Sequence, residues 1–128
     1  ISLGGLIGHW YLHCGGGAPR VSTFVAVGGP LQGSDAARLS VAPPLRFIPS
    51  LGQARPDSAL QAEIRQAPPP DGVRLISLGT RGDVMTPAAA RRAHGYEIVD
   101  TPHGLFPLGH WFLYLHPANL QAVYELIQ

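Results

Sequence analysis

The hydrophobic positions of the chain fall into short runs that alternate between helical and strand-like spacing. Apolar residues from Leu3 to Cys14 recur at intervals typical of a helix, and a run of three glycines follows and ends it. Two β-branched and apolar runs, Val21–Val27 and Val73–Leu78, are bounded by turn residues and predict buried strands. A third, shorter strand is expected over Tyr96–Val99.

The segments that follow the first two strands carry helix start signals. Asp57 or Ser58 is placed to cap a short helix that ends before a proline-rich turn. Thr86 followed by Pro87 predicts an N-cap and a first-turn proline for a helix over residues 88–93.

The C-terminal segment predicts one more helix, which starts at Pro117 and carries Leu120, Val123, Tyr124 and Ile127 on one face. Residues 28–56 are rich in glycine and proline and are expected to be mostly irregular, apart from a short helical piece near 34–39. Because strands alternate with helices, the sequence predicts an α/β fold with parallel strand pairing.

Composition narrows the function classes. The chain has 45% hydrophobic residues, enough for a core, but only 13% charged residues and a formal net charge of +1. All nine basic residues are arginine and no basic cluster extends beyond Arg91-Arg92, so we expect no nucleic-acid partner. The single cysteine, Cys14, excludes an internal disulfide and a cysteine-rich metal site. No apolar run approaches the roughly 20 residues of a transmembrane segment, and no cofactor or metal is expected.

The first five residues carry the sharpest functional signal. Ile1-Ser2-Leu3-Gly4-Gly5 matches the second half of the G-x-S-x-G nucleophile elbow and directly precedes the first predicted helix. In an elbow, a tight strand-to-helix turn exposes the serine hydroxyl, and Gly4 would be needed because a side chain there collides with the turn. The N-terminus of the helix also offers unpaired N–H groups to a developing oxyanion. The alternative for Ser2 is an ordinary helix N-cap.

Further landmarks follow along the chain in the order VSTFVAVGGPLQGS, RPDSALQAEI, VRLISLGTRGDVMTP and GHWFLYLHPANLQAVYELI. Together with the elbow, they resemble the C-terminal half of α/β-hydrolase lipases and esterases, most of all bacterial triacylglycerol lipases. The resemblance implies a partial α/β-hydrolase fold, a mostly parallel sheet with flanking helices whose N-terminal strands are missing. Residues 1–128 would form the C-terminal portion of a single domain that starts at the elbow, and residues 29–56 would form a lid or a substrate-binding connection.

In this fold the partners of the nucleophile follow in the chain order serine, acid, histidine. The resemblance places the acid at Asp83, in the loop after the strand Val73–Leu78, where a carboxylate orients the imidazole of the base. A solvated turn aspartate is the alternative for Asp83. Two rival acids are Asp35, which follows the first strand, and Asp100, which ends the third.

Six histidines compete for the role of base. His9 and His13 share one helix face without an adjacent acidic ligand, so they are expected to be partly exposed helix residues rather than a metal site. His103 and His110 both lie in the long loop after the third strand. Gly109-His110 ahead of the last helix matches the family pattern, so His110 is the expected base and His103 its rival.

The resemblance implies ester hydrolysis through an acyl-enzyme, with a small-molecule or lipid ester as substrate. His110 would take the proton of Ser2, Asp83 would hold the imidazole, and the backbone N–H of Leu3 would supply one oxyanion donor. Apolar residues close to these loops are expected to contact the substrate, although core packing is an equally good explanation for each. These candidate substrate contacts are Leu31, Phe47, Phe106 and Trp111.

Two hypotheses of function follow from these patterns. The first is a serine ester hydrolase whose reactive residues lie in this segment of a longer chain. The second is a non-catalytic remnant of a hydrolase that keeps the pattern and acts as a binding module. Upstream sequence with a glycine-ended strand and an oxyanion loop would favour the first hypothesis.

Overall fold

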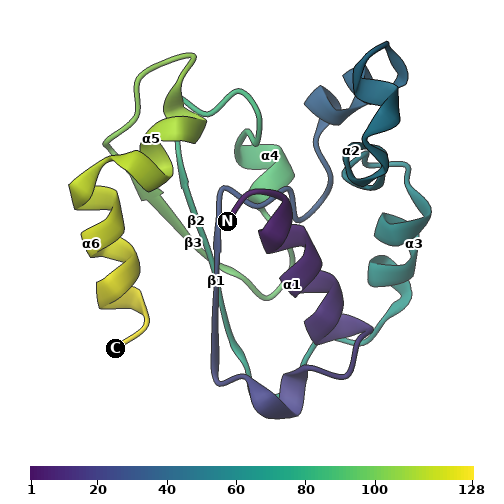
Figure 1. The fold of residues 1–128 in the computed structure, drawn as a ribbon. Helices are drawn as coiled ribbons and strands as arrows, with labels where there is room; N and C mark the ends of the chain where they lie inside the picture. The colour runs from purple at the N-terminus through teal and green to yellow at the C-terminus, as the bar shows by residue number, and fades with distance from the viewer.

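The computed structural model describes residues 1–128 and places a parallel sheet between two layers of helices (Figure 1). The strands are β1 (Thr23–Val27), β2 (Arg74–Thr80) and β3 (Glu97–Thr101). The α-helices are α1 (Leu3–His13), α2 (Pro49–Gln53), α3 (Ala59–Gln66), α4 (Ala88–Arg91), α5 (Gly109–Leu115) and α6 (Pro117–Leu126), and the 3-10 helices are η1 (Ala18–Arg20), η2 (Asp35–Val41) and η3 (Leu45–Phe47). The predicted α/β class with parallel pairing and flanking helices is confirmed.

The sheet is covered on both faces because side chains alternate along each strand. α1 covers one face, and α5 and α6 cover the other (Figure 1). The buried cluster on the α1 side contains Leu12, Ala26, Leu31, Leu75, Ala93 and Tyr96. The cluster on the α5 side contains Val27, Leu78 and Leu113. The central strand β2 is therefore buried along almost its whole length.

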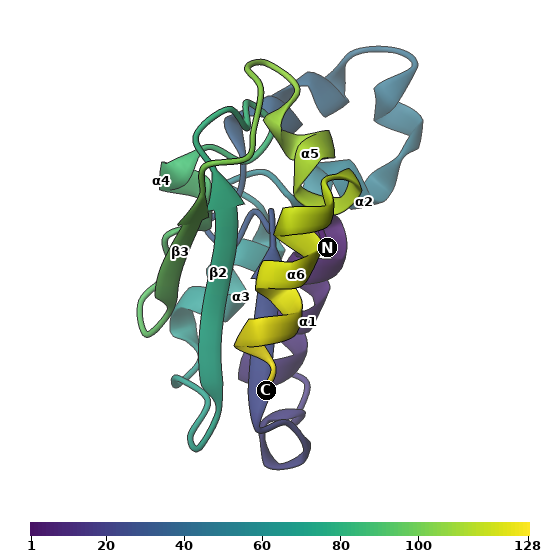
Figure 2. The same ribbon diagram turned by 90° about the vertical axis from the view of Figure 1, so that its left-hand side faces the viewer.

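All three strands run in the same direction, in the order β1-β2-β3. Val27, the last residue of β1, pairs with Leu78, and Thr80, the last residue of β2, pairs with Thr101 at the end of β3. Figure 2 shows the arrowheads of β2 and β3 pointing toward the end of the molecule where α4 and α5 lie. The loops that leave the carboxyl ends of the strands consequently gather at one edge of the sheet.

The first turn of α1 makes a close approach to the loop after β1, but not at the glycine that the elbow pattern singles out. A Cβ atom on Gly5 would lie 3.0 Å from the Cα of Gly29, whereas a Cβ on Gly4 would meet nothing within 4 Å outside its own helix. Gly5 therefore allows the helix to pack on this loop. The expectation that Gly4 carries the steric constraint is wrong in these surroundings.

Two segments contain more helix than the sequence predicts. The connection over residues 28–56 holds η2, η3 and the short helix α2, of which only the first was expected. The loop expected around His110 is instead the helix α5, and His110 is its second residue. Ile48 and Leu108, which precede α2 and α5, supply no side-chain cap, and the one start signal is Pro49 in the first turn of α2.

One local prediction, the N-cap of α4, is wrong for an identifiable reason. The helix α4 is capped at Pro87 and not at Thr86, because the Thr86 hydroxyl donates to a carboxylate, that of Asp83, instead of accepting from the helix. On α6, Leu120 and Tyr124 are exposed, and the buried residue of the helix is Asn119. The Asn119 side-chain amide donates to two carbonyls, which ties α6 to the preceding helix and loop.

The core of β2 yields a test of the fold. Leu78 is fully buried between the two helical layers, so Leu78→Ala should lower the free energy of unfolding by about 2–5 kcal/mol through lost burial and a new cavity. Leu120→Ala on the exposed face of α6 is the matched control and should change it by no more than about 0.5 kcal/mol. Urea unfolding measures both, and equal losses in the two variants would contradict the described core.

Candidate active site

Ser2 directly precedes α1 and lies beside the carboxyl end of β1. Its amide donates to the carbonyl of Val27 at 2.8 Å, and its backbone has φ 52° and ψ −126°. A positive φ is costly for a residue with a side chain, about 1–3 kcal/mol, and such strain is found mostly at functional positions. The Ser2 hydroxyl makes no N-cap hydrogen bond to α1. Its Oγ lies instead 3.0 Å from Nε2 of His110.

His110 is held at this position by a direct backbone contact between α5 and the turn after β2. The amide of Gly109 donates to the carbonyl of Gly82 at 3.0 Å, and Leu108 forms an isolated antiparallel bridge with Asp83. A Cβ atom on Gly109 would lie 2.2 Å from the carbonyl carbon of Gly82, so only glycine fits there. Steric exclusion therefore explains why a glycine precedes His110 in the sequence. The His110 ring is buried.

Asp83 occupies the turn after β2 and is also buried. Its Oδ2 lies 2.8 Å from Nδ1 of His110 and accepts from the Thr86 hydroxyl at 2.6 Å. Its Oδ1 accepts from the amides of Met85 at 2.9 Å and Thr86 at 2.8 Å. Burial by itself raises the pKa of the Asp83 carboxyl, but the hydrogen bonds from His110 and Thr86 outweigh burial and hold that pKa below its ordinary value. Asp83 is therefore an ionised carboxylate at neutral pH.

The ionised carboxylate fixes the tautomer of His110. A carboxylate only accepts hydrogen bonds, so Nδ1 of His110 must carry the proton and donate it to Asp83. The Thr86 hydroxyl, which donates its one proton to Asp83, meets Nδ1 at 3.3 Å as a second, longer acceptor. In the neutral imidazole, Nε2 then carries a lone pair and accepts from the Ser2 hydroxyl.

The first amide of α1 is free to bind an anion next to the Ser2 hydroxyl. The N–H of Leu3 forms no hydrogen bond, because the first N–H groups of a helix have no partner within it. The partial positive charge of the helix N-terminus is directed to the same place. Leu3, which the sequence predicts as an oxyanion donor, thus has a free N–H.

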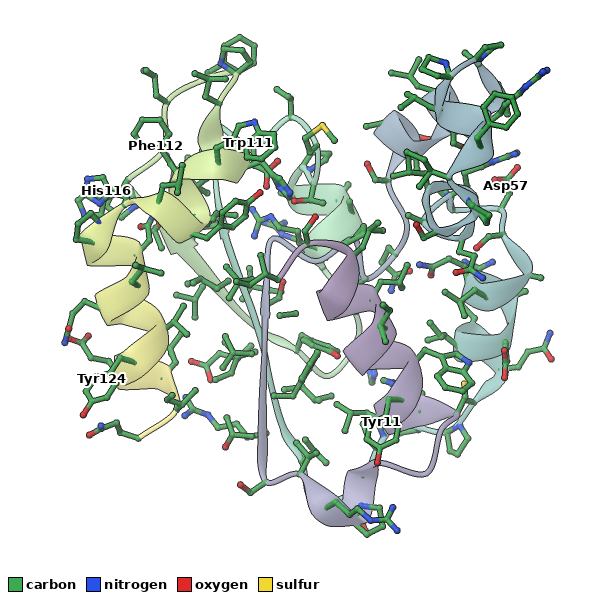
Figure 3. The ribbon with its side chains drawn as sticks, viewed as in Figure 1. Tyr11, Asp57, Trp111, Phe112, His116 and Tyr124 are labelled. Atoms are coloured by element: carbon green, nitrogen blue, oxygen red, sulfur yellow. The ribbon has the colours of Figure 1, made fainter.

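The rival acids and the rival base are engaged elsewhere. Asp35 is exposed and pairs with Arg38 at 2.9 Å, and Asp100 pairs with Arg91 at 2.8 Å. The ring of His103 stacks on that of His116, with 4.7 Å between the ring centroids. Figure 3 shows His116 at the junction of α5 and α6, on the outer side of the molecule.

The histidines of α1 form a separate pair. His9 is buried and its Nδ1 lies 2.8 Å from the hydroxyl of Tyr96, which corrects the expectation of a partly exposed side chain. Burial and the neighbouring His13 lower the pKa of His9 to about 4, so the ring is neutral. His9 is buried because α1 packs on one face of the sheet, where Tyr96, the residue before β3, supplies a polar partner. No group of three or more His, Cys, Asp or Glu side chains is arranged to hold a metal ion.

A cavity of about 380 Å³ opens beside the Ser2 hydroxyl and the His110 ring. Its walls come from the turn after β1, from η2, η3 and α2, and from the Asp83–Thr86 turn. No charged side chain lines it, and its larger apolar members are Leu3, Leu39, Leu45, Leu51 and Met85. The connection over residues 29–56 therefore contributes much of the wall of this cavity.

None of the helices of the molecule is long and apolar enough to cross a bilayer.

The four residues that the sequence nominates as substrate contacts do not line this cavity. Leu31 is directed into the core below α1 by the tight turn over residues 29–33, so it packs and does not face the site. Phe47, the last residue of η3, and Phe106, in the loop before α5, are more than two-thirds exposed. Trp111 lies on α5 at the top of the molecule (Figure 3), and a separate groove with Leu108 and Phe112 contains it. Proximity in sequence did not predict which apolar side chains turn inward.

The Thr86 hydroxyl gives a test of the Asp83 environment. Thr86→Val removes one donor from the ionised carboxylate, so it should lower the free energy of unfolding at pH 7 by about 1.5–3 kcal/mol. Because the folded-state pKa of Asp83 is lowered, the stability it contributes is present above the unfolded pKa of about 3.9 and is lost as the pH falls through the folded value. The difference between variant and wild type should therefore shrink in acid.

Thr101→Val is the matched control for this experiment. The Thr101 hydroxyl is buried but has no hydrogen-bond partner, so its removal should cost little at any pH. Urea unfolding at pH 7 and at pH 3 measures both variants. A loss in Thr86→Val that is independent of pH would contradict the role assigned to its hydroxyl.

The site as a whole has four chemically distinct parts. They are a strained serine with a free hydroxyl, a neutral imidazole that accepts from it, a buried carboxylate that sets the tautomer, and an unpaired amide beside them. Such a set can deprotonate an alcohol as it attacks an electrophile and can stabilise the resulting oxyanion. No family model matches the chain, and no curated protein matches it.

Proposed function

We propose that the protein is a serine hydrolase that cleaves carboxylic esters through an acyl-enzyme, and that its chain is part of an α/β-hydrolase fold. The observation that carries the proposal is the unbroken line of contacts from Ser2 through His110 to Asp83, at 3.0 Å and 2.8 Å. The order of the motifs along the chain and the parallel sheet with flanking helices support the fold.

The first half-reaction follows from the tautomer of His110. As the Ser2 Oγ attacks the ester carbonyl, its proton moves to Nε2, and the imidazolium that forms is stabilised by the carboxylate of Asp83. Collapse of the tetrahedral intermediate breaks the bond to the alcohol oxygen, which takes the proton from Nε2 and leaves. The acyl group is then esterified to Ser2.

Water completes the cycle by the same route. Nε2 of His110 accepts a proton from the water molecule as its oxygen attacks the acyl carbon, and the proton passes to the Ser2 Oγ when the acyl group leaves as a carboxylic acid. In both half-reactions the negative charge develops on the former carbonyl oxygen. The free N–H of Leu3 is the donor in this chain that is placed to stabilise it.

The cavity supports an ester with an apolar acyl group. Its lining has no charged side chain, and its volume of about 380 Å³ admits an alkyl chain rather than acetate alone. Leu39, Leu45 and Met85 line the cavity and are also exposed, so its mouth is apolar as well. An acyl chain leaves water on entering such a cavity, and each buried methylene contributes about 0.8 kcal/mol.

The proposed nucleophile and base can be tested with two variants and one control. Ser2→Ala and His110→Ala should each reduce kcat for a short p-nitrophenyl ester by about 10⁴-fold or more, because the three groups act as a unit. His103→Ala should keep most of the activity, since His103 contacts His116 and not the site.

An alkyl phosphonate gives an independent readout for the same proposal. It should label Ser2 in the wild type, as mass spectrometry of the digested protein would show, and should label His110→Ala poorly. Labelling of another residue would overturn the assignment of the nucleophile. A wild type that is neither labelled nor active would favour the non-catalytic binding module over the hydrolase.

The cavity generates a prediction about acyl length. Leu45→Trp puts a larger side chain at the cavity wall and should lower kcat/KM for a decanoate ester at least about 10-fold relative to the acetate ester. Ile48→Trp is the matched control, because Ile48 ends the same helical turn without lining the cavity. If both variants changed the decanoate-to-acetate ratio equally, the cavity would not be the acyl site.

A further inference from the structure

Arg91, the last residue of α4, is the only arginine of the nine that is buried. Its side chain is 1% exposed, whereas every other arginine lies at least partly in solvent. A buried guanidinium is costly unless it is paired and hydrogen-bonded, and a well-packed apolar residue is often as stable in its place. The contacts of Arg91 therefore need an explanation beyond stability.

The guanidinium lies flat against the central strand of the sheet. A Cβ atom on Gly79 of β2 would lie 2.0 Å from the Cζ atom of Arg91, so a side chain at Gly79 and the guanidinium cannot both occupy this space. Glycine weakens the interior of a strand, and its presence in β2 is a mark of a close approach by another group. The absence of a side chain at Gly79 therefore leaves the space that the Arg91 guanidinium occupies.

Two hydrogen bonds fix the direction of the guanidinium. Nε donates to the carbonyl of Thr86 at 3.0 Å, and Nη2 donates to Oδ1 of Asp100 at 2.8 Å. Nη1 is buried without a partner. Asp100 belongs to β3, so the arginine connects the edge strand of the sheet to the turn that follows the central strand.

Thr86 is the residue that holds Asp83. Its amide donates to Oδ1 and its hydroxyl to Oδ2 of that carboxylate, while its carbonyl, in the next peptide unit, accepts from Arg91. A displacement of Thr86 would carry two of the donors of Asp83 with it. The groups that lower the pKa of Asp83 are His110 and Thr86, so Arg91 acts on the turn through geometry.

We propose that Arg91 is a positioning residue for the reaction: clamped between Gly79 and Asp100, it fixes the carbonyl of Thr86 and thereby the carboxylate of Asp83 against His110. This inference rests on the proposed function, because it assigns a purpose to the alignment of Asp83 and His110. It also explains why Asp100, a rival acid by sequence, does not contact a histidine: its carboxylate anchors the guanidinium.

The proposal is tested by chemical rescue of Arg91→Ala. Misalignment of a carboxylate by about 1 Å should lower kcat about 100-fold, while KM stays near the wild-type value because Arg91 does not line the cavity. Added guanidinium should refill the space above Gly79 and restore kcat in a saturable manner. The same ionic strength of sodium chloride should not. Arg92→Ala, an exposed neighbour, should behave as wild type.

A second readout does not depend on catalysis. The proton on Nδ1 of His110, bonded to Asp83, should give a far-downfield proton NMR signal in the wild type. In Arg91→Ala this signal should move upfield and broaden, and guanidinium should return it. If the wild type hydrolyses no ester, the signal still tests the positioning role, so the failure of one proposal is distinguishable from the failure of the other.

Arg91→Lys keeps the proposal testable if the alanine variant does not fold. A lysine ammonium lacks the planar fork that reaches Thr86 and Asp100 together, so kcat should fall below the wild-type value at an unchanged KM. A folded Arg91→Ala or Arg91→Lys with wild-type kcat and an unshifted signal would overturn the proposal. Loss of kcat that guanidinium does not restore in folded Arg91→Ala would do the same.

Discussion

Parallel pairing of β1, β2 and β3 brings the carboxyl ends of the three strands to one edge of the sheet, and the arrangement of the site depends on this constraint. β1 ends beside Ser2, which donates its amide to Val27. β2 runs into the turn that carries Asp83, and β3 runs into the segment that leads to His110. Residues separated by more than one hundred positions, such as Ser2 and His110, therefore meet because the three parallel strands end at the same edge of the sheet.

Within that frame, close backbone contacts set the distances between the functional side chains. The amide of Gly109 bonds to the carbonyl of Gly82, and the absence of a side chain at Gly109 allows α5 to touch the turn that carries Asp83. A backbone-to-backbone contact of this kind has little conformational freedom, whereas a contact between long side chains can adopt several rotamers. The carboxylate and the imidazole thus approach to 2.8 Å with both rotamers held by packing.

The polar atoms of the site are buried, and nearly all of them have partners within the chain. Asp83 accepts from two amides, a hydroxyl and a ring nitrogen, which is why its pKa stays low despite burial. Arg91 extends the network to β3 through Thr86 and Asp100. The amide of Leu3, beside the apolar cavity, has no partner, and an unpaired donor at such a place is what a developing oxyanion requires.

The sequence by itself determined the alternation of strands and helices, the parallel sheet, and which hydroxyl, carboxylate and imidazole to consider, because periodicity, turn residues and short motifs are local properties. It did not determine the catalytic role of those groups, which stays a prediction. Only the tertiary structure decided that His110 and not His103 meets Asp83, that Leu31 packs in the core, and that η2, η3 and α2 wall the cavity. It alone revealed Arg91 on Gly79. These outcomes depend on contacts between distant segments, and such contacts cannot be recognised from the periodicity or the short motifs of the sequence.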